Sequence, residues 1–283
     1  MRVLVNNEIV HREDVRIDFE DRGYQFGDGI YEVVRVYEGE AYELNEHIHR
    51  FYRSAKEIGI TPPQSKNEMK SNIEDVITEN KLLEGGIYFQ MTRGVAPRKH
   101  QYEKEIEPKL IAYPLYFTRP EKQQNEGVSV LTADDLRWHR CDIKSLNLLY
   151  NIMMKQKAHD SGSFETIFIR DELVTEGTST NVFMIKDNVI STHPADNNIL
   201  NGITRMKVLH LLNEEHIPYE EKSFTKQELL DADEVFITST TSEVMPVLKV
   251  DEQVIGNGLP GILTKRLHSL FLHDIKSPEI VRG

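Results

Sequence analysis

Apolar residues recur with two different periods along this 283-residue chain. Some stretches alternate apolar and polar residues, as strands do, and others repeat apolar residues every three or four positions, as amphipathic helices do. Both kinds occur on each side of a polar segment at 118–127, TRPEKQQNEG. With 39% hydrophobic residues the chain can bury a sizeable core. We therefore predict a mixed α/β (α+β) fold with a first domain at 1–119, an interdomain linker at 120–126 and a second domain at 127–283.

The first domain is predicted to begin with hairpins. Strand patterns at 3–10 and 31–44 are broken by turns near Asn6-Asn7 and Glu38-Gly39. The other elements expected here are a helix capped by Asn45 and stopped at Gly59, a helix at 66–83 that ends at Gly85-Gly86, and strands at 87–92 and 110–117 around a loop at 93–108.

The second domain is also predicted to mix strands and helices. Thr225 and Glu228 have the spacing of a capping box before an apolar turn, which indicates a further helix start. The elements expected are strands at 128–133, 165–177, 180–192, 234–240 and 244–250, and helices at 145–159, 203–216 and 260–275.

Composition excludes several classes of protein. A net charge of −12 opposes binding to nucleic acid, and no apolar run approaches the roughly 20 residues that cross a bilayer. The single cysteine, Cys141, permits no internal disulfide and suits a cytoplasmic protein. No metal site is predicted, because His47 and His49 are alternate residues on a helix and do not share a face. The pair Gly27 and Gly29 lacks the third glycine of a dinucleotide-binding loop.

Lys144 stands between Ile143 and a leucine-rich helix pattern. Apolar surroundings would lower the pKa of its amine and leave it neutral, able to attack a carbonyl carbon. The alternative is a stem that lies along the core while the ammonium reaches water. Taken alone, the residue fits this alternative better, so the catalytic interpretation needs corroboration from other motifs.

Three segments are candidates for holding an anion. The Ser/Thr clusters TEGTSTN at 175–181 and TSTTS at 238–242 each follow a predicted strand, and Ile203-Thr204 begins a predicted helix. Hydroxyls and free backbone N–H groups at such places can hold a phosphate. Each cluster, considered singly, also fits an ordinary turn or helix cap.

Three more charged groups are candidate ligands. Glu176 could pair with a protonated ring nitrogen, and Arg50 could offer its guanidinium to a phosphate, although each is also an ordinary surface residue type. In PRKH, residues 97–100, an extended backbone would point Arg98 and His100 the same way and Lys99 the other way. Arg98 with His100 would form a trap for a carboxylate, or else an exposed basic loop.

Taken together, these motifs resemble the D-amino acid aminotransferases of the fold-type IV pyridoxal-phosphate family over nearly the whole chain. The segments that carry the resemblance are EDRGYQFGDGIYEVVRVYEGE, NEHIHR, PRKH, DIKSLN, VTEGTSTN, GITR and TSTTSE. The resemblance implies a smaller N-terminal α/β domain and a larger C-terminal pseudo-barrel domain. PRKH is the segment that favours the D-amino acid branch over the branched-chain aminotransferases and aminodeoxychorismate lyases.

The resemblance also implies roles for individual residues. Lys144 would bind pyridoxal 5′-phosphate as a Schiff base and move a proton between substrate Cα and cofactor C4′, and Glu176 would keep the pyridine nitrogen protonated. Tyr31, Arg98 and His100 would hold the substrate carboxylate, the last two from the neighbouring subunit of a homodimer. The other cofactor contacts implied are Arg50, Ile203, Thr204 and Thr240 on the phosphate, Ser179 and Ser239 lining the site, and Leu200 on the ring face opposite Lys144.

The leading hypothesis is therefore ping-pong transfer of an amino group between D-alanine or D-glutamate and 2-oxoglutarate or pyruvate. One alternative keeps the cofactor but is a branched-chain aminotransferase or a β-eliminating lyase. A second alternative is a non-enzymatic binding protein, since each motif alone has an ordinary structural explanation.

Overall fold

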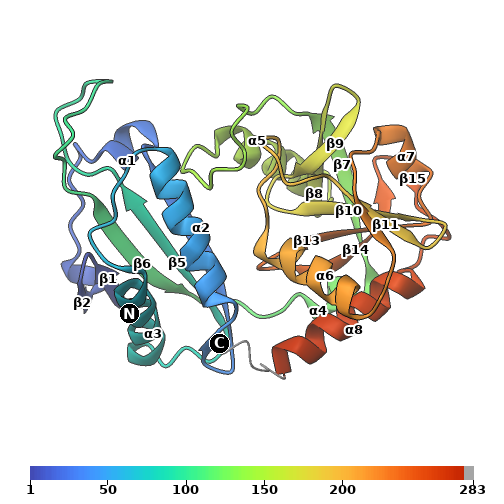
Figure 1. Ribbon diagram of the computed structural model, residues 1–283, viewed down its shortest axis with the longest axis horizontal. Helices are drawn as coiled ribbons and strands as arrows, with labels where there is room; N and C mark the ends of the chain where they lie inside the picture. The colour runs from blue at the N-terminus through green and yellow to red at the C-terminus, as the bar shows by residue number, and fades with distance from the viewer. Residues whose placement is uncertain (277–283) are drawn as a thin grey trace. The chain divides into compact units, whose positions relative to one another are not determined.

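The computed structural model describes residues 1–276 and divides into two compact units (Figure 1). The first unit contains Met1–Thr118 together with Ile143–Leu148, and the second contains Arg119–Asp142 and the chain from Leu149 onward. The segment around Lys144, which the sequence analysis put in the second domain, thus packs with the first unit. The expected linker at 120–126 forms a short helix, α4 (Glu121–Glu126), that counts with the second unit.

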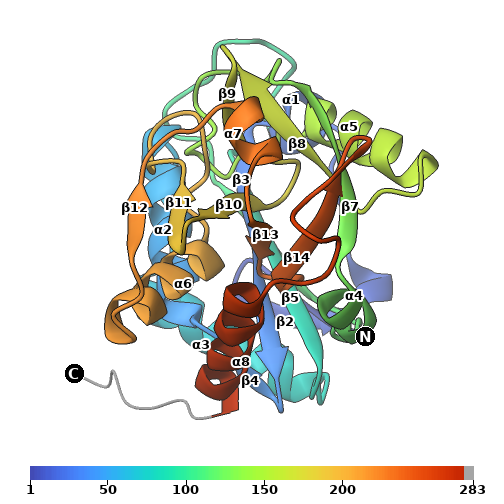
Figure 2. The same ribbon diagram turned by 90° about the vertical axis from the view of Figure 1, so that its right-hand side faces the viewer.

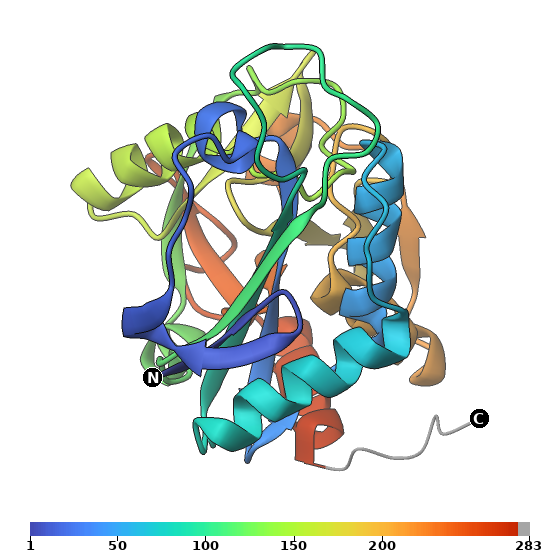
Figure 3. The same cartoon turned by 90° about the vertical axis from the view of Figure 1, so that its left-hand side faces the viewer.

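The first unit is built on a six-stranded antiparallel sheet in the order β2-β1-β6-β5-β3-β4 (Figure 3). Helices α2 and α3 pack on one face of it. The elements are β1 (Arg2–Val5), β2 (Glu8–His11), the 3₁₀ turn Arg12–Asp14, α1 (Arg22–Phe26), β3 (Gly29–Tyr37), β4 (Glu40–Ala41), α2 (Leu44–Glu57), α3 (Lys66–Glu79), β5 (Gly85–Thr92) and β6 (Lys109–Leu115).

Alternation along these strands separates a buried face from a half-buried one. Ile30 and Val34 of β3 and Phe89 of β5 are fully buried under the helices, where Phe51 of α2 packs on Phe89 with the ring centroids 4.9 Å apart. Burying large side chains of this kind contributes about 1.5–3 kcal/mol each. The other face carries Tyr31 and its neighbours, and it becomes part of the candidate site described below.

The second unit contains a nine-stranded mixed sheet that curves into a half-barrel (Figure 2). Along the sheet the order is β12-β11-β10-β13-β14-β7-β8-β9, and β15 pairs with β14. The remaining elements are β7 (Val128–Asp134), α5 (Leu149–Asp160), β8 (Glu165–Arg170), β9 (Leu173–Gly177), β10 (Asn181–Lys186), β11 (Val189–Thr192), α6 (Ile203–Glu214), β12 (Tyr219–Glu221), α7 (Lys226–Leu230), β13 (Glu234–Ser239), β14 (Glu243–Val250), β15 (Gln253–Val254) and α8 (Ile262–Lys276).

Most predicted elements are confirmed, including both hairpin turns and the capping box of Thr225 with Glu228. The helix predicted at 145–159 begins only at Leu149, because residues before it bond to β3 instead: the Leu146 N–H donates to the Gly29 carbonyl at 3.0 Å. Among residues 1–276, no helix is long and apolar enough to span a membrane, and no cluster of side chains there could hold a metal ion.

Two helix ends differ from the prediction. Helix α2 begins at Leu44, with Glu43 before it, so Asn45 lies inside the helix and does not cap it. Helix α3 ends at Glu79, and Gly85 belongs to β5, where its φ of +145° and the Leu115 carbonyl, which an added Cβ would strike, leave room for glycine alone. This glycine thus permits a close strand pairing and does not stop a helix.

Candidate functional site

Lys144 runs beside the start of β3 in the first unit. Its carbonyl accepts the Tyr31 N–H at 3.0 Å, and its own N–H donates to the Ser54 hydroxyl at 3.3 Å. The Nζ atom lies 4.4 Å from the centroid of the Tyr31 ring, and a cation over an aromatic face is attracted by the ring quadrupole. The half-buried amine is therefore held against a phenol ring by a fixed backbone.

Tyr31 begins a row of aromatic rings across the sheet. Its ring stacks on Tyr88 at 5.7 Å, and Tyr88 packs on Tyr113 at 5.1 Å. The Tyr88 hydroxyl donates to Gln90 Oε1 at 2.7 Å. Burial raises the pKa of Tyr88, and the neighbouring tyrosines add to the effect, so this phenol is neutral at neutral pH. The row offers a rigid aromatic surface beside the lysine amine.

On the buried side of β3, Glu32 is fully enclosed and bound by two groups of α2. Arg50 donates from Nε at 2.7 Å and from Nη2 at 2.8 Å, and His47 Nδ1 lies 2.8 Å from Glu32 Oε2. Burial alone would raise the pKa of Glu32, but Arg50 and His47 lower it well below its usual range. Arg50 is predicted to bind phosphate, and the structure shows it in an ion pair with a buried carboxylate that the sequence did not indicate.

Arg50→Met is expected to lower the free energy of unfolding at pH 7 by about 3–5 kcal/mol, because it leaves Glu32 buried without its main counter-charge. The lowered pKa of Glu32 means that the ion pair stabilises the wild type above the unfolded pKa near 4.5 and that this stability is lost as the pH falls. In the variant the stranded carboxyl takes up a proton more readily, so the difference should narrow below about pH 5. Urea unfolding at several pH values measures this, with exposed Lys56→Met in the same helix as the control. A loss of less than about 1 kcal/mol in the free energy of unfolding would mean that the Arg50–Glu32 pair contributes no more than an exposed salt bridge.

The PRKH segment has no regular secondary structure and is exposed. Arg98 lies over the ring of Phe26, with its Cζ 4.9 Å from the ring centroid, and His100 packs on the edge of the same ring at 5.8 Å. Both side chains therefore contact the same ring, although the backbone bends at each of them and is not extended. The pair presents a guanidinium and an imidazole together.

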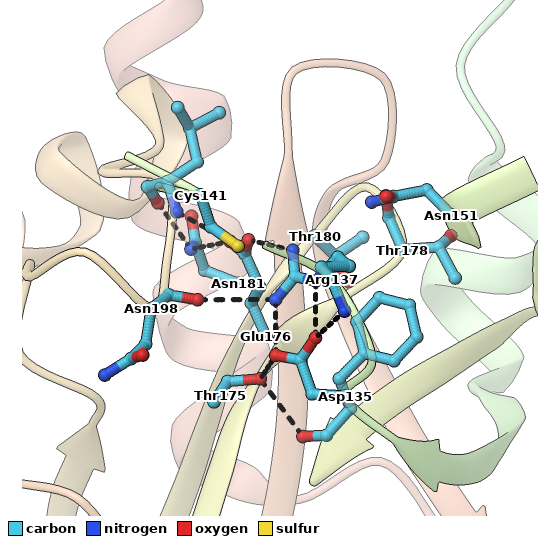
Figure 4. A network of polar contacts seen from close by, with 12 residues as sticks. Asp135, Arg137, Cys141, Asn151, Thr175, Glu176, Thr178, Thr180, Asn181 and Asn198 are labelled. Atoms are coloured by element: carbon cyan, nitrogen blue, oxygen red, sulfur yellow. Dashed lines mark hydrogen bonds and ion pairs between the residues drawn. The ribbon is translucent and has the colours of Figure 1, made fainter. Parts of the chain in front are cut away.

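In the second unit, Glu176 lies near the end of β9 with its carboxylate bound on both oxygens (Figure 4). Oε1 accepts from Arg137 Nη1 at 2.6 Å, and Oε2 accepts from the Leu200 N–H at 2.9 Å and from Asn181 Nδ2 at 3.3 Å. Burial raises the pKa of Glu176, although Arg137 and the Leu200 N–H act in the opposite direction. Asn181 also donates to the Leu200 carbonyl at 2.8 Å, so it joins two of the predicted cofactor contacts.

Arg137 lies between Glu176 and a second carboxylate, Asp135 (Figure 4). Its Nε and Nη2 each lie 2.9 Å from an oxygen of Asp135, which also pairs with Arg170 at 3.0 Å and accepts from the Thr175 hydroxyl at 2.9 Å. Burial alone would raise the pKa of Asp135, but Arg137, Thr175 and Arg170 together lower it. Two carboxylates and two guanidiniums thus balance in charge and hold Glu176 in one orientation.

Cys141 borders this network without the features of a catalytic thiol. Its Sγ donates to the Trp138 carbonyl at 3.2 Å. Burial raises the pKa of the thiol to about 11, so it stays protonated at neutral pH. The buried thiol therefore contributes to packing.

The hydroxyls of TEGTSTN point at a carboxylate. Thr178, Ser179 and Thr180 each donate to Glu165 of β8, with Ser179 Oγ at 3.1 Å from Oε2. Glu165 is fully buried, so these three bonds satisfy a charge that would otherwise be costly. The loop after Glu176 is thereby fixed, because these three hydroxyls bind a carboxylate of the protein itself.

The other two candidate phosphate sites contain groups that no side chain of the described residues binds. Helix α6 begins at Ile203 after Gly202, and no side chain caps its first N–H groups. In TSTTS, Ser239 Oγ contacts the hydroxyl of Ser242, whereas the buried Thr238 Oγ1 has no hydrogen-bond partner among residues 1–276, and Thr240 is half-exposed. An uncapped helix start and an unsatisfied hydroxyl are features that fit an anionic group.

The sequence analysis missed Arg137, Asp135 and Asn181. Asp135 and Arg137 follow the end of β7 two residues apart, which is the same signal that drew attention to the Ser/Thr clusters after β9 and β13. Asn181 is the last letter of TEGTSTN. Opposite charges two residues apart at a strand end could have indicated a shared network.

Comparison with known proteins finds similar sequences, similar structures and a matching family. A D-alanine aminotransferase from Bacillus licheniformis is 56% identical over 277 residues, with 98% of each chain covered. A branched-chain amino acid aminotransferase structure from Escherichia coli matches with a TM-score of 0.90 at 25% identity, covering 100% of this chain and 97% of that one. A branched-chain aminotransferase structure from Thermoproteus uzoniensis with norvaline matches with a TM-score of 0.88 at 25% identity, covering 97% and 94%. The amino-transferase class IV family matches residues 29–250, and this chain therefore belongs to the class IV aminotransferases.

Proposed function

We propose that this enzyme transfers amino groups between D-alanine or D-glutamate and the 2-oxo acids 2-oxoglutarate and pyruvate, with pyridoxal 5′-phosphate as cofactor and ping-pong kinetics. The observation that carries the proposal is the carboxylate of Glu176, fixed by Arg137, Asn181 and the Leu200 N–H. The D-alanine aminotransferase relative at 56% identity supports the choice of substrate.

The residues present fit this cofactor. Glu176 would accept a hydrogen bond from the pyridine N–H and would so keep that nitrogen protonated. The uncapped start of α6 and the unsatisfied Thr238 hydroxyl would receive the phosphate. Bound pyridoxal phosphate supplies an electron sink for negative charge at the substrate Cα. The full set proposed to hold the cofactor is Arg50, Lys144, Glu176, Ser179, Leu200, Ile203, Thr204, Ser239 and Thr240.

Different side chains of the protein are proposed to move the proton and to bind the substrate. Lys144 would hold the cofactor through its amine and would move the proton at the substrate Cα, and its backbone bonds beside β3 fix the reach of its side chain. Tyr31, Arg98 and His100 bind the substrate carboxylate. A carboxylate fixed on one side and an amine on one face leave only one hand of substrate with its Cα proton toward Lys144.

We further propose a cytoplasmic homodimer in which Arg98 and His100 serve the neighbouring subunit. Support for an interface comes from α5, where Leu149, Ile152 and Met153 share one helix face and are 74%, 61% and 53% exposed. Apolar side chains gathered in this way on a surface commonly mark a protein contact.

Adding D-alanine and L-alanine separately to the holoenzyme shows which enantiomer the enzyme uses as amino donor. We expect D-alanine alone to remove the absorption band of the lysine-bound cofactor, because amino transfer releases Lys144 and leaves the aminated cofactor. Recording visible spectra during single additions, with pyruvate then added to restore the band, measures each half-reaction. A response to L-alanine alone would refute the D assignment, while leaving family membership intact.

Elimination from a substrate with a β leaving group is the alternative within the family. D-Chloroalanine, without any 2-oxo acid acceptor, would give pyruvate and ammonia in many turnovers if the enzyme were a lyase. We expect restoration of the band to require an acceptor instead.

A further inference from the structure

The loop between β5 and β6 carries Arg98 and His100 but contains little regular structure, so other groups must hold it. Arg22, the first residue of α1, is only 4% exposed. Its Nη1 donates to the Lys99 carbonyl at 2.6 Å and its Nη2 to the His100 carbonyl at 3.1 Å. One guanidinium therefore binds two consecutive carbonyls of the PRKH segment.

The third donor of this guanidinium fixes it to the sheet. Arg22 Nε donates to Asp28 Oδ2 at 2.8 Å, and the same oxygen accepts from Arg93 Nε at 2.9 Å. Arg93 in turn donates to the carbonyls of Ile58 and Gly59 at 2.7 and 3.2 Å. Asp28 precedes β3 and Arg93 follows β5, so the carboxylate ties Arg22 to two strand ends.

Aromatic rings complete this anchorage. The ring of Tyr102, farther along the loop, lies 3.7 Å from Arg93 Cζ and 5.3 Å from Arg22 Cζ. Phe26 receives Arg22 on its face at 4.8 Å and also contacts Arg98 and His100. Arg22 thus holds the loop at its backbone, Phe26 contacts the side chains of Arg98 and His100, and Arg93 with Arg22 contacts the ring of Tyr102.

From this geometry we propose that Arg22 is a positioning residue for recognition of the substrate carboxylate. It fixes the carbonyls of Lys99 and His100, and thereby the directions in which Arg98 and His100 point. The planar guanidinium of Arg22 donates hydrogen bonds in three directions, to the two carbonyls and to Asp28. The ammonium of a lysine cannot reach all three acceptors in the same geometry. The inference rests on the proposed function, because it assumes that Arg98 and His100 bind a carboxylate.

Arg22→Met is expected to raise KM for D-alanine about 10–100-fold, the effect of a small misplacement of binding groups. Cofactor retention, read from the visible spectrum, should stay unchanged. Ethylamine lacks the carboxylate, so the slow half-reaction with ethylamine should change less than about threefold. Arg16→Met is the matched control, because Arg16 also donates to two backbone carbonyls, at 2.6 and 2.9 Å, but is exposed. Arg22→Lys keeps a charge beside Asp28 and provides a second variant if the methionine variant does not fold; its KM should also rise at least about threefold.

A double-mutant cycle separates this inference from the proposed function. If Arg22 acts through Arg98 and His100, Arg22→Met should raise KM by a smaller factor in the Arg98→Ala background than in the wild type. An unchanged KM in Arg98→Ala would overturn the carboxylate role in the proposed function itself. A raised KM in Arg98→Ala with an unchanged KM in both Arg22 variants would overturn the inference alone. Equal losses with D-alanine and ethylamine would also overturn it, because they would reveal a general disturbance of the fold.

Discussion

Lys144→Ala should lower the rate of D-alanine transamination at least about 10⁴-fold, because it removes both the covalent attachment of the cofactor and the group that moves the Cα proton. The amine is held on the Tyr31 ring and by the backbone bonds of its segment, and no other lysine among residues 1–276 lies over that ring. The absorption band of the lysine-bound cofactor should vanish as well. Stopped-flow spectra with D-alanine and steady-state assays with 2-oxoglutarate give the two readouts.

The control for this experiment is Lys122→Ala, which alters a lysine on α4 whose side chain is 79% exposed. It should retain full activity. Because Lys144 is only half-buried, its removal should leave the thermal midpoint of the cofactor-free protein nearly unchanged, which would show that the loss of activity does not come from unfolding. Activity within tenfold of the wild type in Lys144→Ala would show that another residue moves the proton.

Glu176→Gln should lower kcat about 10²–10³-fold while cofactor remains bound, since the amide keeps the shape of the side chain but loses the negative charge that faces the ring nitrogen. In the variant, Asp135 is the only carboxylate that still pairs with Arg137, so the network of two guanidiniums and one carboxylate has a net positive charge. This charge further disfavours a protonated ring nitrogen. Single-turnover rates with D-alanine measure the chemical step directly, apart from product release.

Glu172→Gln, an exposed change in the turn before β9, is the control and should have no effect on these rates. The amide of Glu176→Gln can still accept from Arg137, so the position of the loop should persist. If Glu176→Gln kept the wild-type single-turnover rate, the ring nitrogen would not depend on this carboxylate, and the central assignment of the proposed function would be wrong.

Local patterns predicted most elements because hydrophobic alternation and capping depend on residues close in sequence. The capping box at Thr225 illustrates this, since both of its bonds join residues three positions apart. The same local logic failed at 145–148, where the leucines suggested a helix. Instead, the bond of Leu146 to Gly29 and that of the preceding Lys144 to Tyr31 join residues more than a hundred positions apart and hold the segment beside β3. Propensity is a weak guide wherever such distant partners compete.

The candidate site shows the same division. Residue types and motifs indicated Lys144 and Glu176, and the resemblance gave them roles, but the partners of these residues depend on tertiary structure. Arg137 meets Glu176 across 39 positions, and Arg22 meets His100 across 78. The sequence also did not indicate that the hydroxyls after Glu176 donate to Glu165, because that carboxylate lies on a neighbouring strand.

The first unit is discontinuous, because the chain leaves it after Thr118 and returns for Ile143–Leu148 before leaving again. A fragment that stops at Thr118 would lack Lys144 and the backbone bonds that its segment makes to the edge of β3. Recombination between related genes at the polar segment 118–127 would therefore join the sheet of one parent to the segment 143–148, with Lys144, of the other. Such chimaeras must keep the contact surfaces of 143–148 and β3 matched, which ties the inheritance of the two segments together.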